Sequence, residues 1–278
     1  MTELMTAPAI EAADAAPAIE AADAAPPPDE SWEDGRLVLP GGVLEGGAVH
    51  RVAWVREPTG RDEELLGDRR YRSGARLATD LLARLVTRVD GVEREVDAAL
   101  VADLLVGDRD YLLLRLRQLA VGDHVHQVMR CPAPGCGERV DVEFRISEIP
   151  VRRAERLQAR YPFTLSRPAW DDDESSDRGT LRLPTGRDQE AIAELADASP
   201  GEANTRLLSR IVLSLGERTG IDEEAARELP LRVRREIGAA LERLAPGPDL
   251  QVVIQCPHCG ADMSYPFDLH DFFLTSGQ

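Results

Sequence analysis

The sequence predicts an α+β fold, in which a helical core is accompanied by short antiparallel strands and a split zinc-ribbon-like module of two zinc knuckles. Three observations lead to this prediction. Some segments repeat leucine and valine at helical spacing, and others alternate apolar and polar residues as strands do. The four cysteines fall into two pairs, each lying between two strand-like segments. The chain has 278 residues, which is enough to bury a real core.

Apolar residues at helical or alternating spacing locate the elements. A helix is expected from Ser73, a good N-cap, to about Val89. Another helix follows the turn at Gly107-Asp108 and is apolar on most sides, so it should lie centrally in the core. Residues 57–70 are charged and rich in turn residues. Further helices are expected at about 97–105, 187–197, 203–215 and 231–244, and strands within 36–56 and at about 124–130, 139–146, 161–168, 179–184, 250–255 and 263–267.

Residues 1–34 differ from the rest of the chain in composition. The nonapeptide APAIEAADA occurs there twice in tandem, at 7–15 and 16–24, ahead of three consecutive prolines. This composition cannot bury much apolar surface, so a disordered low-complexity tail is predicted, with a short helical docking segment as the alternative. The remainder is predicted to be a single zinc-stapled α+β domain over 35–274, with an acidic flexible loop at 169–178 and a C-terminal tail at 275–278.

The charge of the chain limits its partners. The formal net charge is −17 and the pI is about 4.8, which opposes binding to nucleic acids and to anionic membrane surfaces. Aromatic residues make up 4% of the chain, so a base-stacking surface is not expected either. We therefore predict no nucleic-acid partner and no membrane partner.

The sequence also indicates a compartment. No stretch approaches the roughly 20 apolar residues that span a bilayer, and the basic and apolar regions of a signal peptide are missing. The protein is therefore expected in the cytoplasm, where thiols stay reduced. In that compartment four cysteines are more often metal ligands than disulfide partners.

Cys131, Cys136, Cys256 and Cys259 are predicted to form one structural zinc site. They lie in two segments of one design, MRCPAPGCGERVDVEF and IQCPHCGADMSYPF, where a strand leads into Cys-Pro and Cys-Gly leads into the next strand. Such a knuckle turns both thiolates toward one ion, and the glycine permits the positive φ of the turn. Four thiolates complete the tetrahedral shell of Zn²⁺ and leave no open position for catalysis. Because residues 137–255 separate the pairs, the ion would staple distant parts of the chain.

Other interpretations of the cysteines and histidines stay open at this stage. The thiols could be buried and unligated, could hold an iron–sulfur cluster, or could form a redox dithiol in the second pair, which leaves the first pair unexplained. His258 could replace a thiolate, although a solvent-facing turn residue is more usual there. His124 and His126 share one face of a strand and are expected to be ordinary strand residues. His270 is expected at the surface or at a helix N-terminus.

Motifs of the common enzyme classes are missing. The sequence holds no GxxxxGK[ST] phosphate loop, no GxGxxG after a strand, no HExxH and no GxSxG. The acidic run from Asp171 to Glu174 lacks the ligand spacing and the glycine of a calcium loop, so a solvated loop is expected. We therefore predict a non-enzyme, with no catalytic residues and with structural Zn²⁺ as its cofactor.

Several segments resemble one protein family. They are GRDEELLGD at 60–68, the helical segment at 73–92, LLVGDRDYLLLRLRQLAVGDHV at 104–125 leading into CPAPGCG, LRLPTGRDQEAI at 181–192, and the ending CPHCG…PFDLHDFF. Over most of 57–274 the chain is similar to the T-even-type phage baseplate hub assembly chaperone family. Members of this family occur in contractile phage tails and in phage-like contractile injection systems.

The resemblance implies a chaperone that binds baseplate hub or spike proteins during assembly, in the cytoplasm or incorporated in the tail particle. Only the four cysteines carry over as a site, and zinc is expected to staple the fold. A permanent structural baseplate subunit is the first rival. A zinc-ribbon adaptor in transcription or translation is the second, but it requires a basic patch near the knuckles, whose flanks are neutral to acidic.

Overall fold

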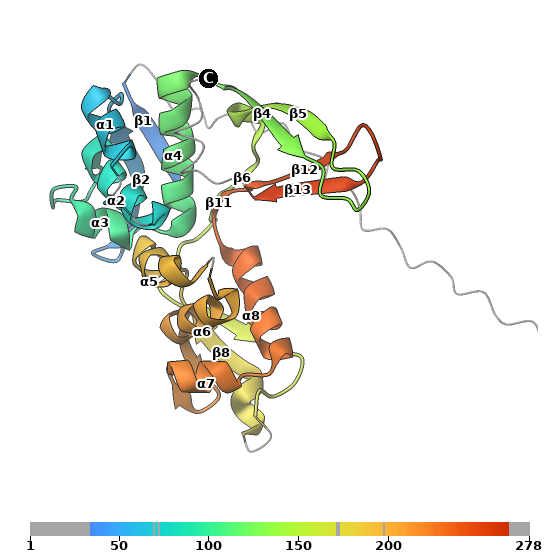
Figure 1. Cartoon of the computed structure of the whole chain (residues 1–278). Helices are drawn as coiled ribbons and strands as arrows, with labels where there is room; N and C mark the ends of the chain where they lie inside the picture. The colour runs from blue at the N-terminus through green and yellow to red at the C-terminus, as the bar shows by residue number, and fades with distance from the viewer. Residues whose placement is uncertain (1–33, 69, 72, 171–172, 197, 267–278) are drawn as a thin grey trace, which may run out of the picture.

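The computed structural model describes residues 34–68, 70–71, 73–170, 173–196 and 198–266. Figure 1 shows two lobes, one above the other, and two β-hairpins that project together from the side of the upper lobe. The disordered tail predicted for 1–34 lies outside the described residues except for Asp34, as does the tail predicted at 275–278. No helix among the described residues is both long and apolar enough to cross a bilayer.

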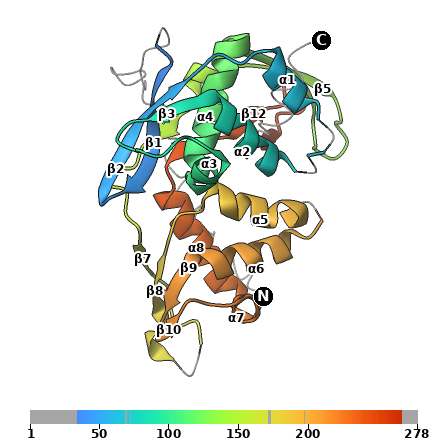
Figure 2. The same cartoon turned by 90° about the vertical axis from the view of Figure 1, so that its left-hand side faces the viewer.

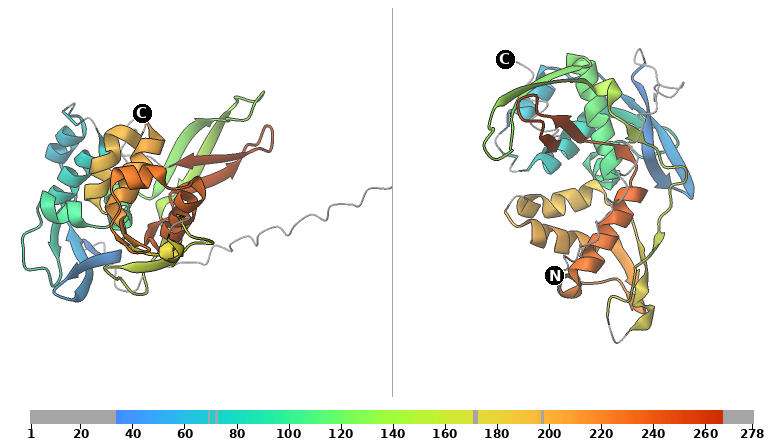
Figure 3. Two further views of the ribbon diagram at one scale, coloured as in Figure 1. Left: turned by 90° about the horizontal axis from the view of Figure 1, so that it is seen from below. Right: turned by 90° about the vertical axis from the view of Figure 1, so that its right-hand side faces the viewer.

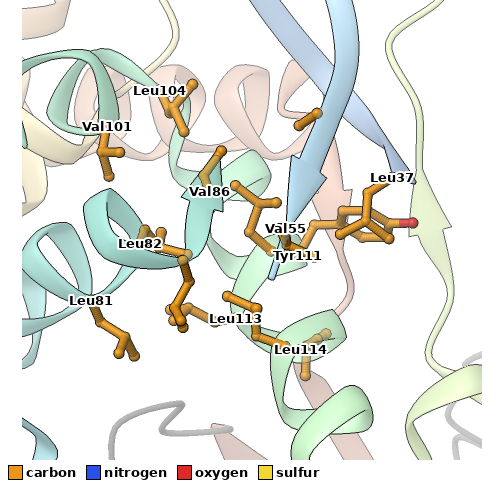
Figure 4. Close-up of a cluster of buried hydrophobic side chains, with 14 of the residues drawn as sticks. Leu37, Val55, Leu81, Leu82, Val86, Val101, Leu104, Tyr111, Leu113 and Leu114 are labelled. Atoms are coloured by element: carbon orange, nitrogen blue, oxygen red, sulfur yellow. The ribbon is translucent and has the colours of Figure 1, made fainter. Parts of the chain in front are cut away.

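The first lobe packs one antiparallel sheet against four helices. Its strands β1 (Arg36–Glu45), β2 (Ala48–Val55) and β3 (Val86–Val89) lie in the order β1-β2-β3. Its helices are α1 (Gly60–Leu66), α2 (Gly74–Leu85), α3 (Ala98–Asp103) and α4 (Val106–Val121). Leu82 of α2, Val86 of β3 and Leu113 of α4 point into a common apolar core (Figure 4). The central position predicted for the α4 segment is confirmed, because Leu112, Leu114 and Leu116 are all buried in this core.

The second lobe has its own sheet and its own core. The sheet order is β10-β9-β8-β7, and the core includes Phe163, Leu208 and Ile237. Helix α5 contacts α2, α3 and α4, so it lies between the two lobes (Figure 2). The elements are β7 (Tyr161–Thr164), β8 (Arg178–Leu181), α5 (Gly186–Ala196), α6 (Pro200–Ile211), β9 (Val212–Leu215), β10 (Arg218–Thr219), α7 (Glu223–Glu228) and α8 (Leu231–Leu244).

The projecting module consists of two hairpins that lie side by side in Figures 1 and 3. One hairpin pairs β4 (His124–Arg130) with β5 (Arg139–Arg145), and the other pairs β12 (Gln251–Gln255) with β13 (Asp262–Pro266). At the base, a 3₁₀ turn at Ile146–Glu148 leads to β6 (Val151–Arg152), which pairs with β11 (Gly247–Pro248). The α+β prediction with short antiparallel strands is thereby confirmed. That 35–274 is a single domain stays a prediction.

The chain repeats the same order of elements twice. The series β1, β2, α1, α2, β3, α3, α4 and the first hairpin corresponds to β7, β8, α5, α6, β9, α7, α8 and the second hairpin, with the two-residue strand β10 added after β9 in the second half. The registers agree as well, because Trp54 pairs with Arg88 in the first lobe as Thr180 pairs with Ser214 in the second, and both ladders shift immediately afterwards. The two halves are therefore copies of one structural unit.

Buried polar interactions are repeated along with the elements. Asp62 accepts hydrogen bonds from the guanidinium of Arg56 (2.8 and 3.0 Å), just as Asp188 accepts from that of Arg182 (2.6 and 2.9 Å). Arg109 Nη1 donates to the hydroxyl oxygen of Thr79 (2.8 Å). Correspondingly, Arg234 Nη1 donates to that of Thr205 (3.0 Å). Their Nη2 groups donate to the carbonyl oxygens of the corresponding residues Ala75 and Gly201.

Two predicted helices are too long, and for the same reason in each repeat. The helix predicted to reach Val89 ends at Leu85, and the one predicted for 203–215 ends at Ile211. The apolar residues that follow, Val86–Val89 and Val212–Leu215, complete the sheets as β3 and β9. These residues continue the apolar spacing of the helix in the sequence, but their backbone is extended.

Two helices were missed and one loop is more ordered than predicted. Helix α1 lies within the segment interpreted as a turn, and α7 was not anticipated. Where the acidic loop at 169–178 is described, Glu174–Asp177 forms a 3₁₀ turn. Its Ser176 is buried, and the Ser176 hydroxyl oxygen accepts from the backbone of Ala169 and Trp170. This part of the loop predicted at 169–178 is therefore ordered, and the solvated run predicted from Asp171 to Glu174 stays a prediction.

The junction of the lobes is close-packed at Gly107. A Cβ atom on this residue would overlap the carbonyl oxygen of Pro246. We expect Gly107→Ala to lower the free energy of unfolding by about 2–3 kcal/mol in a urea titration, because backbone must move to relieve the overlap. The matched control is Gly238→Ala on α8, where nothing lies within 4 Å of the new methyl group. That change should stabilise by up to about 1 kcal/mol, and equal effects of the two variants would contradict the packing argument.

Candidate metal centre

The two cysteine pairs occupy equivalent turns of the two hairpins. In the first knuckle the backbone N–H of Cys131 donates to the carbonyl of Glu138 (2.9 Å), and in the second that of Cys256 donates to Ala261 (2.9 Å). Gly137 and Gly260, which follow the second cysteine of each pair, have φ values of 67° and 72°. The predicted positive φ is thereby confirmed, since only glycine adopts it without strain.

The four sulfur atoms are arranged as a tetrahedral ion requires. All four lie within 4.8 Å of one another, with 3.7 Å between Cys131 and Cys259 and 3.9 Å between Cys136 and Cys256. A zinc ion with Zn–S bonds of about 2.3 Å places neighbouring sulfurs about 3.8 Å apart. A disulfide would require about 2.05 Å. The predicted ligand set is therefore brought together as unbonded thiols, and its geometry fits Zn²⁺.

The internal repeat relates the two cysteine pairs of this centre to each other. The repeat pairs Cys131 with Cys256 and Cys136 with Cys259, as the first and second cysteines of their knuckles. The Sγ–Sγ distance of 3.7 Å between Cys131 and Cys259 therefore has its counterpart in the distance of 3.9 Å between Cys256 and Cys136. Each structural unit supplies half of the ligands, so a bound ion would join the two units at an approximate twofold axis.

Without a cation between them, the cysteine thiols differ strongly in how readily they ionise. The N–H of Ala133 donates to Cys131 and lowers the pKa of this thiol, but burial and the neighbouring sulfurs outweigh it and raise the pKa to about 12. Burial opposes ionisation of Cys256 too, yet N–H groups of His258 and Cys259 bring its pKa down to about 7. A divalent ion would bind the thiolates and displace their protons. Metal affinity should therefore rise with pH.

A small apolar cluster surrounds the sulfurs. Cys131 and Cys256 are buried with Val140, Val142 and Met263, apart from the cores of the two lobes. His258 is exposed in its turn, in agreement with the prediction. His124 and His126 are exposed strand residues, as predicted, and His270 lies outside the described residues. Across the part of the chain that the structure describes, the four cysteines are the one group arranged to hold a metal ion.

Sequence reasoning singled out GDRDY at the start of α4 but assigned no role to its charges. Asp108 is fully buried and accepts the backbone N–H groups of Gly41 (2.7 Å) and Gly42 (2.8 Å) in β1. Arg109 binds α2 as described above, and Thr79 in turn donates to Glu190 of α5. These charges tie α4 to the sheet and to the second lobe. The available signal was an Asp-Arg-Asp run directly ahead of the apolar Tyr-Leu-Leu-Leu segment.

Two carboxyls of this segment predict a pH effect. Burial raises the pKa of both Asp108 and Asp110 to about 7, whereas an aspartate in the unfolded chain titrates near 3.9. The folded state thus holds protons that the unfolded state releases, so this contribution to stability is full below pH 4 and is lost as the pH rises through 7. We expect Asp110→Asn to reduce the loss of stability between pH 5 and pH 8 by about 2 kcal/mol. Urea unfolding at both pH values measures this, with the exposed Glu194→Gln as control, and an unchanged profile in Asp110→Asn would refute it.

Comparison with known proteins gives one match. The family model described as T4 bacteriophage base plate protein matches residues 79–274. The matched range includes the GDRDY segment, both knuckles and the whole second lobe. No curated protein matches the chain, and no solved structure does so either.

Proposed function

Because this chain belongs to the T4 bacteriophage base plate protein family, we propose that it is a non-catalytic assembly factor for the baseplate hub of a contractile tail. In this role it binds hub or spike proteins while the baseplate is built, in the cytoplasm. The family match over 79–274 is the observation that carries the proposal, since it spans the whole second structural unit and the first unit from within α2 onward.

The architecture supports a scaffold role. The ligand set would fix the tips of the two hairpins to each other, and the β6–β11 pair fixes their bases. A four-thiolate shell has no open position for a substrate or a water, so zinc here would supply rigidity and no chemistry. The net charge of −17 limits non-specific association, which suits a protein that must leave or join a partner selectively.

A pull-down tests the proposal directly. The tagged full-length chain would be expressed together with the baseplate, tube and spike genes of its own tail cluster, and captured proteins identified by mass spectrometry. We expect a hub or spike protein to be enriched at least about tenfold over a tag-only control. Capture of no baseplate protein from cells that express all of them would overturn the proposal.

A permanent structural subunit is the second candidate, and the family description, which names a base plate protein, favours it. The two candidates differ in what the finished particle contains. Electron microscopy and quantitative mass spectrometry of purified tails would show this chain at fixed stoichiometry if it is a subunit. An assembly factor would be enriched in hub intermediates and depleted from the finished tail.

A further inference from the structure

The internal repeat reveals one helix face that is more buried in the first unit than in the second. Aligning the helices on Arg109 and Arg234 pairs Leu114 of α4 with Ala239 of α8, and Val106 with Leu231. Leu114 is 2% exposed, but Ala239 is only half-buried. Leu231 is 71% exposed, which makes it the most exposed large apolar side chain of the described residues. The second unit therefore exposes a surface that the first unit covers in part, since Leu114 is buried there and Val106 is partly buried.

This open face has also acquired positive charge. Arg235 and Arg243 of α8 stand where α4 has Asp110 and Gln118. Arg167 lies beside them, since the carbonyl of this residue accepts a hydrogen bond from Arg232 of α8 (3.1 Å). We name Leu231, Arg167, Arg235 and Arg243 the arginine face; all four are exposed.

The charges of the arginine face are not neutralised internally. None of its three guanidinium groups forms an ion pair within the described residues. The nearby carboxylate of Glu236 is already engaged, because it accepts from the backbone and hydroxyl of Ser166 (2.6 and 2.8 Å) and from Arg232. Glu242 is the remaining exposed carboxylate on this side of α8. Arginines therefore outnumber free carboxylates on this surface.

We propose that the arginine face of α8 is the docking surface for an acidic segment of a baseplate partner, which pairs with Arg235 and Arg243 and covers Leu231 with an apolar side chain. This inference rests on the proposed function and names the surface that performs it. Arginine is enriched in protein–protein interfaces and at their energetically dominant positions, and burying the exposed Leu231 side chain adds a favourable apolar contribution. A nucleic acid or an anionic membrane does not fit, because a chain with a net charge of −17 repels an extended polyanion.

The test compares two double variants of the full-length chain. Arg235→Ser with Arg243→Ser removes charge from the face, while Arg61→Ser with Arg139→Ser removes two exposed, unpaired arginines elsewhere. Capture of the hub or spike protein is quantified for each at low and high salt. We expect the face variant to bind about tenfold more weakly and to lose most of the salt dependence, whereas the control variant keeps wild-type binding. Leu231→Ser should weaken capture at both salt concentrations.

The outcomes separate this inference from the proposed function. Failure of the wild-type chain to capture any baseplate protein refutes the function itself. Normal capture that is unaffected by the face variant, or equally reduced in the control, overturns the docking surface alone. The acidic residues of 1–33 in the same chain are a competing occupant: Glu3, Glu11, Asp14, Glu20, Asp23, Asp29, Glu30 and Glu33. If deleting 1–33 speeds amide hydrogen exchange in α8 without a partner present, the face belongs to that segment and the partner assignment is wrong.

Discussion

Removing the metal, or replacing Cys256 by serine, is expected to separate the two hairpins while both lobes keep their helices. The sulfurs belong to a small cluster of their own, apart from the cores of the two lobes. Beyond the knuckles, the hairpins are joined to each other at their bases by the two-residue strands β6 and β11. Structural zinc binding is worth on the order of 10 kcal/mol in small zinc domains, so its loss should exceed what this cluster alone can supply.

Hydrogen-exchange mass spectrometry with metal analysis measures this result. After chelation, amides of β4, β5, β12 and β13 should lose protection, whereas far-UV circular dichroism retains the helical signal. The internal repeat also predicts that Cys131→Ser reduces the protection of the hairpins as much as Cys256→Ser does. His258→Ala, an exposed change in the same turn, serves as the control. Unchanged protection of the hairpins in a protein shown to be free of metal would rule out the staple.

The clustering of the four cysteines could be predicted because its signal is local. A knuckle fits within a few residues, and two knuckles of one design specify one tetrahedral site wherever the chain brings them together. The local pattern does not reveal how the fold brings the two knuckles together. The approximate twofold relation of Cys131 and Cys256 follows from a repeat of the whole unit, which the alternation and spacing of single segments do not reveal.

The errors in secondary structure have a different cause. Val86 and Val212 continue an apolar stripe at helical spacing, yet both begin strands. These apolar residues can be buried in the core either as helix or as strand. They form strands because the edge of β2 or β8 offers backbone groups for hydrogen bonding. Such pairing depends on residues far away in sequence, so a window of neighbouring residues favours the longer helix.

The repeat itself left one clear trace in the sequence. The pentapeptide Pro-Thr-Gly-Arg-Asp occurs at 58–62 and again at 184–188. Its meaning lies in the aspartates, which are buried in the structure. From sequence alone, a charged residue in such an acidic chain is assigned to the surface, because the arginine that neutralises it is identified only when the fold is known.

Asp188→Asn is expected to destabilise the protein by about 3 kcal/mol, since it removes the fully buried carboxylate that neutralises the partly exposed guanidinium groups of Arg182 and Arg210. Asp188 is fully buried and accepts from Arg182, from Arg210 Nε (2.7 Å) and from the backbone of Thr185 (2.9 Å). An asparagine amide has one acceptor oxygen and turns a donor toward the remaining arginine. Urea unfolding at pH 7 gives the difference in free energy directly.

The pH dependence of this variant gives an independent check. Although burial opposes ionisation, the hydrogen bonds from Arg182 and Thr185 hold the pKa of Asp188 at about 2. The pKa is depressed in the folded state, so the contribution to stability is complete above about pH 4 and is lost as the pH falls toward 2. The deficit of Asp188→Asn should therefore be constant from pH 5 to 7 and shrink as the pH falls from about 4 to about 2. Asp62→Asn, the equivalent change in the first unit, should behave alike but with a smaller deficit, because Asp62 pairs with one arginine, Arg56, whereas Asp188 pairs with two. Asp141→Asn, at an exposed carboxylate on β5, should leave the stability unchanged, and a deficit there equal to that of Asp188→Asn would show that burial is not the cause.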